Sequence, residues 1–146
     1  PLHVPLVALT TEDSERYSLS DFDAYGDWRS LDVFPKGNGF VQLGPAGGSP
    51  AFLPSVAMFH QMHCLQVLRT TIVQGRADQH ARHCLNFLRQ TVLCASDTTL
   101  DALDSKKGTK GLGSVHVCRD WQKVYDFVEE NHLKHMNVSG WLTDPV

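Results

Sequence analysis

The 146-residue sequence contains no long apolar run and no dense cluster of basic residues. A helix needs about 20 consecutive apolar residues to cross a bilayer, so we expect none of these residues to span a membrane. The formal net charge is −3, and the nearest approach to a basic cluster is the segment 106–110 within a glycine-rich stretch. Because nucleic-acid binding depends on clustered positive charge, the sequence argues against DNA or RNA as a partner.

The sequence also lacks the patterns by which side chains alone catalyse a reaction. It has no nucleophile elbow of the form Gly-x-Ser-x-Gly and no spacing of acidic residues that suggests a paired-carboxylate centre. If the protein is an enzyme, a metal ion should therefore do the chemistry. The composition, 42% hydrophobic and 20% charged, is that of a globular protein, and the length suits one domain spanning 1–146.

An initiating methionine is absent, since the sequence opens at Pro1. We expect it to be a trimmed or processed form, in which a signal peptide or membrane anchor would lie upstream. The segment Asn137-Val138-Ser139 is an N-glycosylation sequon, a short pattern that favours the secretory pathway only weakly.

The pattern of the chain changes near residue 55. Residues 1–54 are rich in proline and glycine and read as an irregular arm, in which only 39–43 resembles a short strand. Trp28, Leu31 and Phe34 could pack this arm onto the remainder. Residues 55–146 have helical patterning. We therefore predict a mainly α fold with an irregular N-terminal arm containing short β segments.

Three helices are predicted in the second part. Ser55 can cap a helix that ends near Gly75, and Asp78 can cap a second that ends near Ala95. The short linker favours an antiparallel helical hairpin, and residues 97–117 read as loop. Asp120 can cap a third, packing helix, whose apolar stripe consists of Trp121, Val124, Tyr125 and Val128.

A His-x-x-His-Cys motif occurs twice, once in each helix of the predicted hairpin. Residues three and four apart lie on one helix face, so each copy places two imidazoles and a thiol together. Imidazoles in a helix interface are costly to bury without a partner, and a metal ion is a partner that neutral imidazole binds well. The first copy contains His60, His63 and Cys64, and the second contains His80, His83 and Cys84.

We interpret His60, His63, His80 and His83 as metal ligands that form one four-imidazole site or two neighbouring sites. His80 would lie in the first helical turn, where the helix dipole keeps imidazole neutral. Ligand type leaves Zn, Cu, Fe and Ni open. His116 could add a fifth imidazole or be a loop residue, and Cys64 and Cys84 could be thiolate ligands or disulfide partners. The remaining histidines, which are His3, His132 and His135, read as surface residues, and the repeated Arg69 and Arg89 as solvated or ion-paired charges.

The paired motifs resemble the UstYa-like family of fungal secondary-metabolite oxidases. The resemblance extends over residues 55–128 and is weak before them. It includes a Cys-x-x-Asp segment at Cys94 and Asp97, and a His-x-Cys-Arg-Asp-Trp segment that begins at His116. A single copy of the His-x-x-His-Cys motif would not be specific, but the doubled motif is.

The resemblance implies an oxidase held in the lumen of the secretory pathway by an N-terminal transmembrane helix. It implies copper held by the two His-x-x-His pairs, and O₂ as co-substrate. The reaction would be oxidative cyclisation, hydroxylation, desaturation or halogenation of a peptide or other secondary metabolite. Some members of the family act as pairs of related subunits. The lumen also favours a disulfide state for Cys94 and Cys118.

Two other functions stay open on the sequence. A structural zinc domain, or a non-catalytic partner subunit of such an oxidase, would use the same histidines to fasten the hairpin. A metal-free module held together by two disulfides is the third interpretation. The substrate cannot be read from the sequence.

Overall fold

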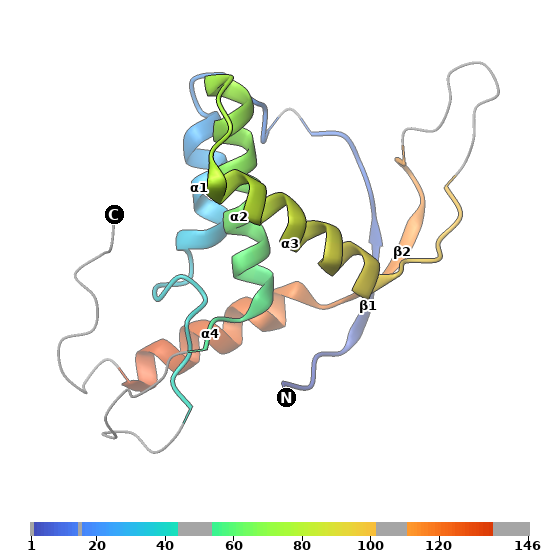
Figure 1. The fold of residues 1–146 in the computed structure, drawn as a ribbon. Helices are drawn as coiled ribbons and strands as arrows, with labels where there is room; N and C mark the ends of the chain where they lie inside the picture. The colour runs from blue at the N-terminus through green and yellow to red at the C-terminus, as the bar shows by residue number, and fades with distance from the viewer. Residues whose placement is uncertain (1, 15, 44–53, 102–110, 136–146) are drawn as a thin grey trace.

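The computed structural model describes residues 2–14, 16–43, 54–101 and 111–135. Within them, helices predominate over a two-stranded sheet, which confirms the mainly α prediction (Figure 1). None of the helices in these ranges is long and apolar enough to cross a bilayer. The elements in chain order are β1 (Leu6–Thr10), α1 (Ala24–Val33), α2 (Ala57–Gln74), α3 (Gln79–Ala95), β2 (Val115–Arg119) and α4 (Trp121–His135).

Helices α2 and α3 pack against each other and carry the two motif copies. α2 ends at Gly75, which adopts the left-handed conformation (φ 65°) that glycine accepts without strain. Asp78 starts α3, because its Oδ1 accepts a hydrogen bond of 2.8 Å from the amide of Ala81. Both signals are confirmed, whereas the predicted Ser55 cap is wrong. α2 begins after Val56 and has no side-chain cap.

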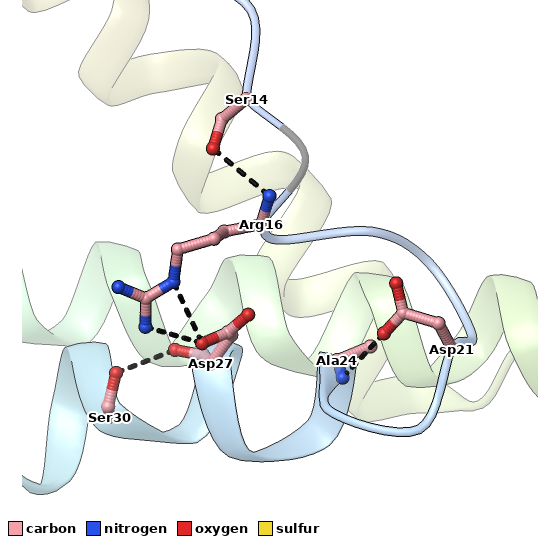
Figure 2. A network of polar contacts seen from close by, with 6 residues as sticks. All are labelled: Ser14, Arg16, Asp21, Ala24, Asp27 and Ser30. Carbon is pink, nitrogen blue, oxygen red and sulfur yellow. Dashed lines mark hydrogen bonds and ion pairs between the residues drawn. The ribbon is translucent and has the colours of Figure 1, made fainter.

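Helix α1 corrects the prediction that residues 1–54 are irregular. The carboxylate of Asp21 accepts a hydrogen bond of 2.8 Å from the amide of Ala24, the first residue of the helix, whereas the N-cap residue Asp23 makes no side-chain cap bond. Arg16 bonds to Asp27 through Nε at 3.1 Å, and the Ser30 hydroxyl donates to the Asp27 carbonyl at 2.7 Å (Figure 2). α1 packs against α2. The N-terminal arm therefore contributes a helix that packs against the first motif-bearing helix.

Short β segments were predicted in the N-terminal arm, and β1 is one, although it lies outside 39–43; β2 was not predicted. β1 pairs antiparallel with β2, with Leu6 opposite Arg119 and Thr10 opposite Val115. The prediction that 97–117 is loop is therefore wrong for its last three residues. The predicted strand at 39–43 reduces to a single bridge between Phe40 and Ser55.

The apolar core lies between α2, α4 and the segment around Val41. Val41, Phe59, Val124 and Val128 are buried. α4 begins as predicted, since Asp120 Oδ1 accepts hydrogen bonds from the two amides at residues 122 and 123 (3.1 and 3.4 Å). The stripe on α4 packs through Val124, Tyr125 and Val128, while Trp121 stays 47% exposed.

Packing of the N-terminal arm depends on fewer residues than predicted. Trp28 and Leu31 are half-buried, whereas Phe34 is exposed. The Tyr125 hydroxyl of α4 donates to the Leu31 carbonyl at 2.5 Å. This bond links α1 to α4.

Three charged or titratable side chains lie deeper than predicted. His135 is buried, with Nδ1 2.7 Å from the Asn131 carbonyl, and His132 is half-buried. Of the three histidines predicted to lie on the surface, His3 alone is exposed. Arg69 is buried as well, whereas Arg89 is exposed and bonds to Asn86 at 3.1 Å. The interpretation as solvated charge therefore holds for Arg89 and is wrong for Arg69.

Two hydrogen bonds from the Asn131 side chain connect the segment around Val41 to α4. Its Oδ1 accepts from the Gln42 amide at 2.8 Å, and its Nδ2 donates to the Gln42 carbonyl at 3.0 Å. Asn131→Ala removes both bonds from a buried backbone, and we expect it to lower the free energy of unfolding by about 1–3 kcal/mol. Urea denaturation measures the change. Asn86→Ala, at an exposed position of α3, should cost much less; equal losses would contradict the assignment.

Candidate metal centre

Each histidine of the first motif lies beside a histidine of the second. The ring centroids of His60 and His83 are 5.9 Å apart, and those of His63 and His80 are 5.3 Å apart. A metal-bound imidazole nitrogen lies about 2.0–2.1 Å from its ion, so two rings that share an ion have centroids roughly 5–6.5 Å apart. Both centroid separations fall within this range, and the ring planes are inclined by 26° in the first pair and 34° in the second.

The four rings form two pairs rather than one cage. Within the part of the chain that the structure describes, no group of three or more His, Cys, Asp or Glu side chains has the geometry of a metal site. Imidazole nitrogen is nevertheless a donor that suits both copper and zinc. The donor set fits either ion, and bringing more than two imidazoles onto one ion requires the side chains to rotate.

Burial differs between the two helices. His60 and His63 on α2 are half-buried, whereas His80 and His83 on α3 are exposed. The His60 ring also stacks on Phe87 at 4.2 Å. Desolvation, followed by the neighbouring histidines, lowers the pKa of His60 below its usual value. His60 is therefore neutral near pH 7, the form that binds a metal. The expectation that the histidines face a neighbour rather than water is met on α2 only.

The two motif cysteines lie between α2 and α3 and are fully buried. Burial and the hydrogen bond with Cys84 raise the pKa of the Cys64 thiol to about 12. A thiol that stays protonated is a poor metal ligand. All four cysteines of the chain are free thiols in this structure. The packing of Cys64 against Cys84 therefore favours a role in the helix interface over one as ligand.

His63 has a further polar neighbour that the sequence did not reveal. Its Nδ1 lies 3.5 Å from Oδ2 of Asp32, a buried residue of α1. The other carboxylate oxygen of Asp32 pairs with Arg29 Nη1 at 3.3 Å. Because α1 was not predicted, nothing in the sequence pointed to Asp32.

A cavity of about 480 Å³ opens beside the α2 histidines. This volume is in the range of small-molecule sites, which run from about 300 to 1,000 Å³. Its wall is polar near α1 and apolar near Phe59. The lining includes Arg29, Asp32, Phe40, Phe59, His60 and His63. A molecule bound there would lie against two of the four candidate ligands.

His116 lies at the opposite end of α3 from the paired histidines. Its Nδ1 is 2.6 Å from Asp97 Oδ2, just beyond the helix. Ala95 lies about 18 Å along the helix from His83, at about 1.5 Å per residue. Hydrogen bonds from Thr99, and then the one from His116, lower the pKa of Asp97 to about 2. The structure therefore does not bring His116 to the other imidazoles as a fifth ligand.

The bond between Asp97 and His116 joins the two segments that carry the remaining cysteines. Cys94 is exposed in the last turn of α3, and Cys118 is half-buried on β2. Their predicted disulfide stays a prediction. Asn137, the predicted glycosylation residue, lies outside the described residues.

Comparison with known proteins gives a matching family model and several curated relatives. The family model described as mycotoxin biosynthesis protein UstYa matches residues 34–131. The UstYa family oxidase phomYb of Diaporthe leptostromiformis is 32% identical over 85% of this chain and 61% of its own length. Oxidase ustYa of Aspergillus flavus is 36% identical over 54% of this chain and 42% of its own.

A third relative, the hydroxylase cctR of Talaromyces islandicus, is 33% identical over 57% of this chain and 35% of its own length. The chain thus spans about a third to three fifths of the length of these curated relatives. No solved structure gives a significant match. The matched residues 34–131 include both motif copies and make up most of the sequence. The chain therefore belongs to the UstYa family of fungal mycotoxin biosynthesis proteins.

Proposed function

We propose that this chain forms the metal-binding part of a copper-dependent oxidoreductase of fungal natural-product biosynthesis. Its substrate would be a C–H or aromatic position of a peptide or other secondary metabolite. The observation that carries the proposal is the pairing of His60 with His83 and of His63 with His80. The names of the relatives, oxidases and a hydroxylase, support the class of reaction.

The four histidines would hold the ion as neutral imidazoles. Copper, when bound, would supply one-electron redox chemistry with O₂. The exposed imidazoles of His80 and His83 leave the α3 side of the site open to solvent. Because the rings form two pairs, an ion held by one pair would keep coordination positions free, whereas a structural metal is closed by four protein ligands.

The cavity beside His60 and His63 would bind the substrate. Phe40 and Phe59 would form an apolar wall against the substrate, and Arg29 could donate hydrogen bonds to a polar group of the substrate. This placement would keep the position to be oxidised next to the α2 imidazoles. The position that is oxidised would therefore depend on how this wall orients the substrate relative to the ion.

We also propose a location in the lumen of the secretory pathway, with a membrane anchor and a second, related subunit in the full-length protein. The family resemblance supports these points. The disulfide between Cys94 and Cys118 belongs to the same proposal, because lumenal proteins form such bonds. The contact between Asp97 and His116 favours it by holding the end of α3 against β2.

Metal analysis tests the choice of ion. The protein, purified from a secreting host without chelators, should contain copper by elemental analysis. It should also give a Cu(II) electron paramagnetic resonance signal with nitrogen hyperfine structure. The opposite result would be zinc at full occupancy, no electron paramagnetic resonance signal, and no change in metal content after copper is added. That result would overturn the oxidase proposal and support a structural zinc domain.

A further inference from the structure

We propose that Asp32 of α1 is a positioning residue that holds the His63 imidazole in the orientation for metal binding. The juxtaposition that carries this inference is the 3.5 Å contact between Asp32 Oδ2 and His63 Nδ1. It rests on the proposed function, because it assigns a role to Asp32 at the same metal centre.

The carboxylate of Asp32 is held in place by burial and by an ion pair. Its side chain is 7% exposed, and a buried carboxylate is costly unless it is paired. Arg29, one helical turn earlier, pairs with Oδ1 at 3.3 Å. The remaining oxygen, Oδ2, faces α2 and meets His63. The carboxylate is therefore held from one side and available on the other.

The contact selects which nitrogen of His63 is free. A carboxylate can only accept a hydrogen bond, so a bond at this contact would place the proton on Nδ1 and leave the lone pair on Nε2. Histidines that bind metals nearly always donate their second ring nitrogen to a carboxylate or carbonyl, which fixes the ring and raises its basicity. At 3.5 Å the contact is longer than the roughly 2.7–3.2 Å of an N–H···O hydrogen bond, so the imidazole would have to move towards Asp32 for the bond to form.

The four candidate ligands differ in whether a carboxylate lies beside the imidazole. Within the described ranges, His63 is the one among them that has a carboxylate oxygen within 4.0 Å. His60 instead stacks on Phe87. His63 is therefore the ligand whose orientation is set by charge, and loss of Asp32 should affect its pair with His80 first.

Three variants separate a positioning role from a merely structural one. Asp32→Leu removes the acceptor and keeps a side chain of similar size, and Asp32→Asn keeps a weaker acceptor. Asp27→Leu is the matched control, because Asp27 lies on the same helix and pairs with Arg16 away from the histidines. Copper affinity is measured by competition with a chelator, and folding by circular dichroism.

We expect Asp32→Leu to bind copper about 10- to 100-fold more weakly, as is usual for such outer partners. Asp32→Asn should lie in between, and Asp27→Leu should match the unaltered protein. If Asp32→Leu does not fold, Asp32→Asn carries the test. Copper affinity that is unchanged in a folded Asp32 variant would overturn the proposal.

A measurement without metal keeps the two proposals apart. Nitrogen-15 NMR of the imidazoles should show His63 protonated at Nδ1 in the unaltered protein and as a mixture of tautomers in Asp32→Leu. The Asp27→Leu spectrum should be unchanged. Failure of the unaltered protein to bind copper would refute the proposed function alone, whereas an unchanged His63 tautomer in Asp32→Leu would refute the role of Asp32.

Discussion

Alanine in place of His63 is expected to remove the bound copper and abolish turnover. His63 faces His80 across the hairpin, so the substitution leaves one imidazole where two would share the ion. Loss of a direct ligand should weaken copper binding by more than 100-fold, since loss of an outer partner alone costs on the order of 10- to 100-fold. His83→Ala should have a similar effect through the other pair.

Elemental analysis after dialysis and oxygen consumption with ascorbate as electron donor measure these effects. His3→Ala is the control, because His3 is exposed and outside both motifs. It should keep the copper content and activity of the unaltered protein. Full turnover by His63→Ala, or by unaltered protein stripped of its metal, would refute the proposed site.

Phe59→Ala is expected to have the largest effect on stability. Phe59 is 1% exposed and its ring lies 4.8 Å from that of Tyr125. A side-chain atom added at Gly39 would lie 2.3 Å from Phe59 Cβ, so the ring fills the space fully. Truncating such a ring leaves a cavity and costs about 3–5 kcal/mol. The same change removes part of the cavity wall beside His60.

Urea denaturation gives the free energy of unfolding for this variant. Phe22→Ala is the matched control, because Phe22 is 99% exposed. We expect the control to stay within about 0.5 kcal/mol of the unaltered protein. A loss below about 1 kcal/mol in Phe59→Ala would show that the core does not depend on this ring.

The parts of the fold that the sequence predicted are those with local signals. Gly75 ends α2 because it can adopt positive φ, and Asp78 and Asp120 start helices because their carboxylates reach amides two or three residues ahead. The three-residue spacing within each motif predicted that its two histidines lie on one helix face. Their arrangement across the hairpin then followed from a short linker.

The parts that were missed depend on contacts distant in sequence. β1 and β2 pair across more than 100 residues, so neither strand's partner could be found from its local sequence. α1 contains a glycine at residue 26 and no clear apolar stripe, so its packing against α2 overrides weak propensity. Asp32 and its contact with His63 were invisible for the same reason, as was the burial of His135.

The antiparallel crossing of α2 and α3 has a consequence for how such a chain can change over time. Each imidazole pair draws one member from each half of the duplication, so neither half is useful by itself. Loss of a whole motif copy would remove one histidine from each pair, so the other copy could not replace it. The doubling is thus not redundancy, and selection must act on the two halves as a single unit.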